Sequence, residues 1–203
     1  MMAAIGTGLT SKTALWYTSR ATGIILLVLL AAVMMLGLMV NRQGRLPGLP
    51  RFAVTGLHRN LSLLSLAFLA VHIATAVADG FVSIPWISGI IPFTSNYRAF
   101  WLGMGAVAVD LMLAVILTSL VRGRIPAGLW RFVHWSSYVL FPVMIAHSIG
   151  SSPDLQSGWM LGLTVAVCIL VGVGALMRAV AELGQTPRAA RVAALVGHGR
   201  TDR

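Results

Sequence analysis

The sequence predicts an all-α integral membrane protein, folded as one bundle of five transmembrane helices. Hydrophobic residues make up 58% of the 203 residues and charged residues only 10%, whereas a soluble domain needs roughly a quarter charged residues to cover its surface. Five apolar stretches reach the length of about 20 residues that a helix needs to cross a bilayer. The net charge of +10 would suggest nucleic acid on a soluble domain. Here the cations lie between apolar stretches, so we expect membrane lipid, and no nucleic acid, as the partner.

The apolar stretches are expected to be helices because a backbone in lipid must satisfy its own hydrogen bonds. The first stretch is too long for the apolar part of a signal peptide, so we expect a retained helix. The five helices form a single domain over residues 1–180. The spans are expected near Ala21–Val40, Leu61–Ala78, Ala99–Val121, Phe132–Ile149 and Trp159–Met177.

Positive charge is divided unevenly between the two sides of the membrane. Twelve of the 15 Lys and Arg residues lie in the first and third connections and the C-terminal segment, which share one side, and three lie on the other. Because cations favour the cytoplasmic side, we expect an outer N-terminus and a cytoplasmic C-terminus, in a cell membrane of the bacterial inner or plasma type. Residues 181–203 are expected to be a short, basic and mobile cytoplasmic tail.

Four of the five histidines form a pattern on the second and fourth spans, which run in the same direction. His58 and His72 lie fourteen positions apart on one span, and the interval between His134 and His147 on the other is one position shorter. At about 1.5 Å per residue both separations are about 20 Å. His58 and His134 therefore share a depth near the cytoplasm, and His72 and His147 share one nearer the outside. Ionisable residues inside a membrane are functional candidates by default.

The facing of the histidines differs between the two spans. At about 100° per residue, fourteen steps fall about 40° short of four turns, so His58 and His72 share a face. Thirteen steps fall about 140° short, so His134 and His147 diverge on an ideal helix. Pro142 lies between them and removes a backbone hydrogen bond, so we predict a kink or local unwinding there.

Two histidines at each of two depths are the ligand set of two b-type hemes. Each iron would take one axial nitrogen from each helix, and the two hemes would form an electron path across the membrane. The plainer interpretation is that isolated histidines form hydrogen bonds between helices. That interpretation explains one or two histidines easily, but four at matched depths poorly.

The chain resembles a known family through these histidine segments, LHRNLSLLSLAFLAVH on one helix and WRFVHWSSYVLFPVMIAH on the other. They look like the ferric reductase-like transmembrane domain, a superfamily that includes ferric reductases, NADPH oxidases and the bacterial heme subunit of the methionine-sulfoxide reductase system. The resemblance covers about Leu15 to Met177. It implies an inner heme ligated by His58 and His134 and an outer heme ligated by His72 and His147.

The resemblance also has two departures. The family core commonly has six helices, and the five here look like that core without its first helix. Ferric reductases and NADPH oxidases carry a flavin- and nicotinamide-binding region after the last helix, whereas the roughly 25 residues here hold no glycine-rich dinucleotide fingerprint. We therefore expect the electron donor on the cytoplasmic side to be a separate protein, a bound flavin or a quinol.

Three charged residues are candidates for supporting roles. Guanidinium groups pair with carboxylates such as heme propionates, so Arg59, which follows His58, could serve the inner heme, and Arg20 the outer one. The alternative for both arginines is a role as interfacial anchors. Asp110 lies in the third span, where it could relay a proton or accept a hydrogen bond from a ligating histidine; a structural hydrogen bond to a neighbouring helix is the favoured alternative.

The predicted function is that of a diheme b-type cytochrome, which passes electrons from a cytoplasmic donor to an outer acceptor. By resemblance the acceptor is ferric iron, oxygen or a partner protein, and the chain is either a heme-dependent oxidoreductase or the membrane subunit of one; no residue is assigned as catalytic. Two alternatives remain. One is a heme-free accessory membrane subunit that stabilises a partner. The other is a histidine-lined metal-ion carrier, which the separation of about 20 Å along each helix disfavours.

Overall fold

The computed structural model describes residues 12–41, 50–80, 82–152 and 158–198, and within these ranges every regular element is a helix. Five helical segments are long and apolar enough to cross a membrane, as the sequence predicts. The long helices are α2 (Lys12–Asn41), α3 (Arg51–Ala78), α4 (Ala99–Leu120), α5 (Ala127–Trp135), α6 (Ser137–Ser151) and α7 (Gly158–His198), with short 3₁₀ turns η1 (Trp86–Gly89) and η2 (Arg122–Arg124).

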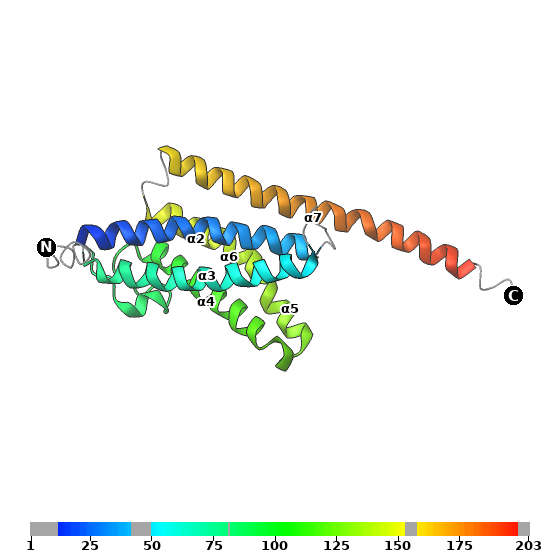
Figure 1. Ribbon diagram of the computed structural model, residues 1–203, viewed down its shortest axis with the longest axis horizontal. Helices are drawn as coiled ribbons and strands as arrows, with labels where there is room; N and C mark the ends of the chain where they lie inside the picture. The colour runs from blue at the N-terminus through cyan, green and yellow to red at the C-terminus, as the bar shows by residue number, and fades with distance from the viewer. Residues whose placement is uncertain (1–11, 42–49, 81, 153–157, 199–203) are drawn as a thin grey trace.

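The helices associate in pairs. In Figure 1, α2 and α3 lie side by side along their whole lengths, and α7 crosses α2 on another side. The second pair is α4 with α6, which α5 continues beyond a break. The helix α3 does not pack closely against α6 or α5; its extensive neighbour is α2. The two histidine-bearing segments are therefore held apart, each on its own partner helix.

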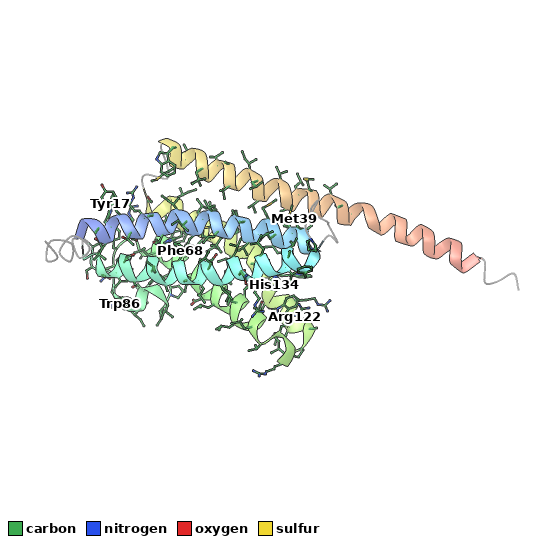
Figure 2. The ribbon with its side chains drawn as sticks, viewed as in Figure 1. Tyr17, Met39, Phe68, Trp86, Arg122 and His134 are labelled. Carbon is green, nitrogen blue, oxygen red and sulfur yellow. The ribbon has the colours of Figure 1, made fainter. Side chains whose placement is uncertain are left out.

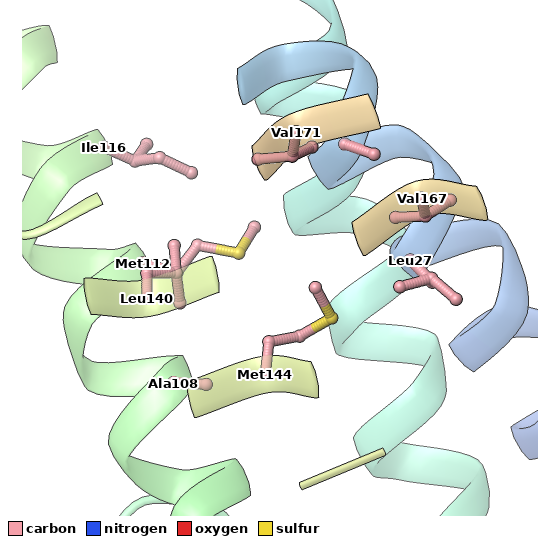
Figure 3. Close-up of a cluster of buried hydrophobic side chains, with 9 residues drawn as sticks. Leu27, Ala108, Met112, Ile116, Leu140, Met144, Val167 and Val171 are labelled. Carbon is pink, nitrogen blue, oxygen red and sulfur yellow. The ribbon is translucent and has the colours of Figure 1, made fainter. Parts of the chain in front are cut away.

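The fully buried apolar core lies between α2, α4, α6 and α7, and α3 contributes only partly buried residues that pack against it, Leu66 and Leu69. Figure 3 shows Leu27 and Val167 facing Met144 across this core. Alanine and methionine supply four of its nine buried residues; small side chains let helices approach closely in a membrane, and methionine fills irregular gaps. The buried cluster consists of Leu27, Ala31, Ala108, Met112, Ile116, Leu140, Met144, Val167 and Val171.

The fourth span is interrupted at Ser136, between α5 and α6. The Ser136 N–H donates to the Val133 carbonyl at 3.0 Å, a bond that reaches back only three residues. Such a turn advances about 120° per residue instead of about 100°, so it adds rotation that the interval from His134 to His147 lacks. A distortion between the two histidines is therefore present, as predicted. The prediction of a kink or unwinding at Pro142 is wrong, because the helix is tightened at Ser136 and α6 continues through Pro142 without a break.

The C-terminal segment, predicted as a short basic tail, is helical through His198. Helix α7 continues without interruption from Gly158 through His198, and Figure 1 shows it extending well past the other helices. Alanine, which has the highest helix propensity, is the most frequent residue between positions 181 and 198. The mobility of the tail stays a prediction, and residues 199–203 lie outside the described residues.

Candidate functional site: two histidine pairs

The structure brings the four patterned histidines together as two pairs. The first histidine pair is His58 of α3 and His134 of α5, whose ring centroids lie 6.4 Å apart with an interplanar angle of 64°. The second histidine pair is His72 of α3 and His147 of α6, which lie within electrostatic range of each other. The pairing matches the depths predicted from the spacing. Figure 2 shows His134 at one end of the bundle and Tyr17 at the other.

His72 is held by the backbone of α2. Its Nδ1 lies 2.8 Å from the carbonyl oxygen of Ser19, and because a carbonyl only accepts, Nδ1 carries the proton. The Ser19 carbonyl is the one that pairs with the N–H of Gly23 in a regular α-helix. Gly23 has no side chain to cover that carbonyl; a Cβ added there would lie 3.1 Å from His72 Cε1.

His58 repeats this arrangement toward the other end of both helices. Its Nδ1 donates to the Val33 carbonyl at 3.0 Å, and a Cβ added at Gly37 would lie 3.3 Å from His58 Cε1. The glycine again stands four residues after the accepting carbonyl. The repeat follows from the antiparallel register of α2 and α3, because the interval from Ser19 to Val33 equals that from His58 to His72 and returns nearly to the same helix face.

His147 is held in the same way by α4. Its Nδ1 lies 2.8 Å from the Trp101 carbonyl oxygen, and a Cβ added at Gly105 would lie only 2.6 Å from His147 Nδ1 and Cε1. The Ser151 hydroxyl also lies 3.2 Å from the same Nδ1. Three histidines on two different helix pairs thus share one device: a carbonyl, with a glycine four residues later.

This arrangement leaves the Nε2 atom of each of the three imidazoles able to ligate a metal. With Nδ1 protonated and bonded to a carbonyl, the lone pair is on Nε2, and the ring orientation is fixed. Backbone partners of this kind also raise the basicity of the ligating nitrogen. The three rings are therefore in the tautomer that ligation through Nε2 requires.

His134 lacks the device. Within the part of the chain that the structure describes, its Nδ1 is buried and has no hydrogen-bond partner. Instead, the indole of Trp130 stacks on the imidazole, with centroids 4.9 Å apart and an interplanar angle of 22°. The guanidinium of Arg122 lies 3.9 Å above the same indole.

The geometry of the first histidine pair fits a heme iron between the two rings. With a metal–nitrogen distance of about 2 Å, two imidazoles on opposite sides of one ion have ring centres about 6 Å apart, which agrees with the observed 6.4 Å. Because α3 does not pack closely against α5 or α6, His58 and His134 come from helices on opposite sides of the site. Elsewhere in the described residues, no group of three or more His, Cys, Asp or Glu side chains could hold a bare metal ion.

The two predicted arginines have different surroundings. Arg20 is half-buried, with its guanidinium 4.2 Å from the centroid of the Trp16 ring and 4.0 Å from Met160 Sδ. It directly follows Ser19 in the chain, whose carbonyl holds His72, but its printed side-chain contacts are with Trp16 and Met160. Arg59 follows His58 and is exposed, as an interfacial anchor would also be.

Asp110 is not part of either histidine pair. It lies on an exposed face of α4. Its carboxylate has no hydrogen bond or ion pair within the described parts of the chain, so the structural hydrogen bond favoured from the sequence is not found. A helix places side chains around its whole circumference, and position within a span does not determine which side faces neighbours.

The supporting glycines were not predicted from the sequence. Gly23 and Gly37 are separated by the same interval as His58 and His72. This shared interval on adjacent spans was a signal that α2 and α3 meet at both places. No second glycine on the same span repeats the interval from His134 to His147, so the sequence offered no comparable signal for Gly105.

Comparison with known families agrees with the membrane fold. The family model described as ferric reductase like transmembrane component matches residues 22–145, which is more than half of the chain. The match includes His58, His72 and His134 and ends two residues before His147. No curated protein and no solved structure matches the chain. The chain is a multi-pass membrane protein that belongs to the ferric reductase-like transmembrane family, which suggests a role in membrane electron transfer.

Proposed function

We propose that this protein is a transmembrane diheme cytochrome b, in which His58 and His134 ligate one heme and His72 and His147 ligate the other. The observation that carries the proposal is the common tautomer of three of these histidines, each with Nδ1–H on a backbone carbonyl and Nε2 left for a ligand. The 6.4 Å ring separation of the first pair supports it.

A heme held by each histidine pair would supply one-electron transfer. The chain contributes the orientation and basicity of the ligands. Ser19, Val33 and Trp101 hold the imidazoles through their carbonyls. Because two histidines would ligate each iron, the substrate would not bind to the iron itself. The substrate would instead be reduced at the surface of the protein.

The direction of transfer is proposed from the charge distribution. The excess of Lys and Arg beside the connection of α2 to α3 and near η2 supports a cytoplasmic location for the end of the bundle with the first histidine pair. Electrons then enter at that end from a separate donor protein, a flavin or a quinol, and leave from the second histidine pair at the outer side. Arg20, which follows Ser19 in the chain, is the proposed partner for a propionate there, and Arg59 is its counterpart beside the first pair.

The test is a reduced-minus-oxidised visible spectrum of the detergent-purified protein, with heme content measured as the pyridine hemochrome. The expected result is a low-spin b-type spectrum with two hemes per chain. His72→Ala should remove one heme, and His198→Ala, outside both pairs, should remove none.

Folded protein that contains no heme, when produced with ample heme, would overturn the proposal and favour an accessory membrane subunit. A His72→Ala protein that retained both hemes would instead overturn the ligand assignment alone.

A further inference from the structure

The four histidines are oriented by two different devices, and this difference has a structural cause on α4. His147 meets the Trp101 carbonyl and Gly105. Because α4 runs antiparallel to the α5–α6 segment, moving back from His147 to His134 corresponds to moving forward along α4 by about the same interval. The equivalent carbonyl is that of Ala114, and the position four residues later is Thr118.

Thr118 stands at the position where the other three sites have a glycine. Its hydroxyl donates to the Ala114 carbonyl at 2.7 Å and lies 3.3 Å from the Val115 carbonyl. At this register position a side chain therefore bonds to the carbonyl, whereas the other three carbonyls meet an imidazole. The buried His134 Nδ1 has no hydrogen-bond partner among the described residues.

His134 contacts the indole of Trp130 instead of a backbone carbonyl. The Trp130 ring lies nearly parallel to the His134 ring, 22° from it, at a centroid distance of 4.9 Å. The indole is itself fixed at two points. Its Nε1–H donates to the Ser119 hydroxyl at 3.3 Å, and the Arg122 guanidinium lies 3.9 Å from the centroid of its ring. A guanidinium over an indole is a stabilising cation–π contact.

We propose that Trp130, held by Arg122 and Ser119, is the positioning residue for the His134 imidazole, in place of the backbone carbonyl that orients the other three histidines. The column of Arg122, Trp130 and His134 also brings a permanent positive charge to the first histidine pair. The proposal rests on the diheme function and names the residues that orient and tune one of its two sites.

Stacking constrains a ring differently from a hydrogen bond. It sets the plane of the imidazole but leaves rotation within that plane free, whereas a carbonyl on Nδ1 fixes the direction of Nε2 as well. Without a partner on Nδ1, His134 is also the less basic ligand. The Arg122 guanidinium lies 3.9 Å from the centroid of the Trp130 ring that stacks on His134, and a nearby cation favours the reduced form of a metal centre because it opposes the loss of an electron.

The test compares variants of the column with matched neighbours outside it. Trp130→Leu removes the aromatic face, and Trp130→Phe keeps a face but loses the bond to Ser119. The matched control is Trp135→Leu, because Trp135 directly follows His134 and is 63% exposed. For the charge, Arg122→Gln is compared with Arg124→Gln, an exposed arginine of the same turn η2.

The readouts are heme content, the low-spin electron paramagnetic resonance signal of each heme and the two midpoint potentials. We expect Trp130→Leu to lose or broaden the signal of one heme, with the other unchanged, and Trp130→Phe to restore it in large part. Arg122→Gln should lower one midpoint potential, whereas Trp135→Leu and Arg124→Gln leave both signals and both potentials in place.

The proposal is overturned if Trp130→Leu and Trp135→Leu give the same signals and potentials. If Trp130→Leu fails to fold, Arg122→Gln and Ser119→Ala test the proposal instead, because both variants preserve the indole. Wild-type signals and potentials in both of these variants would also overturn the proposal. Wild-type protein without heme would contradict the proposed function instead, so the two failures are distinguishable.

Discussion

The two ends of the bundle hold chemically identical ligands by different means. At the end of the second histidine pair, both imidazoles donate to carbonyls at 2.8 Å, and each rests on a glycine of the neighbouring helix. At the end of the first pair, only His58 has this support, whereas His134 is stacked under Trp130. Each of the three carbonyls that hold a histidine in the described part of the chain is followed, four positions later, by a glycine.

The largest expected effect comes from filling a glycine at the second pair. A Cβ added at Gly105 would lie 2.6 Å from His147 Nδ1 and Cε1, closer than packed atoms can approach, so Gly105→Ala must displace the imidazole. We expect loss of one heme, measured as a halved pyridine hemochrome content. The control is Gly172→Ala, where no atom lies within 4 Å; full heme content in Gly105→Ala would contradict the role assigned to this glycine.

The glycines of α2 should give a graded effect. An added Cβ would lie 3.1 Å from the His72 ring at Gly23 and 3.3 Å from the His58 ring at Gly37, so small shifts of the ring suffice in both cases. We expect Gly23→Ala and Gly37→Ala to keep both hemes and each to change the low-spin resonance signal of a different one, with Gly23→Ala the larger change. If both variants changed the signal of the same heme, the assignment of Gly23 to His72 and of Gly37 to His58 would be contradicted.

A glycine can also be introduced at Thr118, the position equivalent to the three glycines. Thr118→Gly removes the Cβ and the hydroxyl that bonds to the Ala114 carbonyl, and so offers His134 the partner that the other histidines have. We expect a sharper low-spin signal for the first-pair heme, at a cost of about 1 kcal/mol or less in helix stability. Thr118→Ala is the control, since it removes the hydroxyl but keeps the Cβ; the same signal in both variants would show that the glycine is not what matters.

A smaller effect is expected from Ser151→Ala. The Ser151 hydroxyl lies 3.2 Å from His147 Nδ1, but the Trp101 carbonyl is closer, at 2.8 Å. The carbonyl alone satisfies the donor, so we expect heme content to stay at the wild-type value and the midpoint potential of the second-pair heme to move only slightly. Loss of that heme would mean that the hydroxyl, and not the carbonyl, orients the ring.

The smallest effect is expected from Asp110→Asn. Asp110 is exposed on α4 and belongs to neither histidine pair, so both heme signals and both potentials should equal those of the wild type. A shift in either potential would place the carboxylate in electrical contact with a heme, contrary to its position on the helix.

The candidate site was predictable in part. The depths of the four histidines follow from the rise of a helix, so the pairing of His58 with His134 and of His72 with His147 is available from spacing alone. The need for a distortion in the fourth span was also predictable, because the interval from His134 to His147 does not complete four turns. Its place at Ser136 was not, since Pro142 is the residue that usually explains a kink.

The sequence by itself determined that the chain has five spans with histidines at two depths, because hydropathy and helical period depend only on the order of residues along each segment. The tertiary structure decided which carbonyl meets each of three imidazoles, that His134 Nδ1 has no partner among the described residues, and that Asp110 faces outward. These contacts depend on the register and rotation of one helix against another. Register and rotation are set by the packing of the whole bundle, and no pattern within a single helix specifies them.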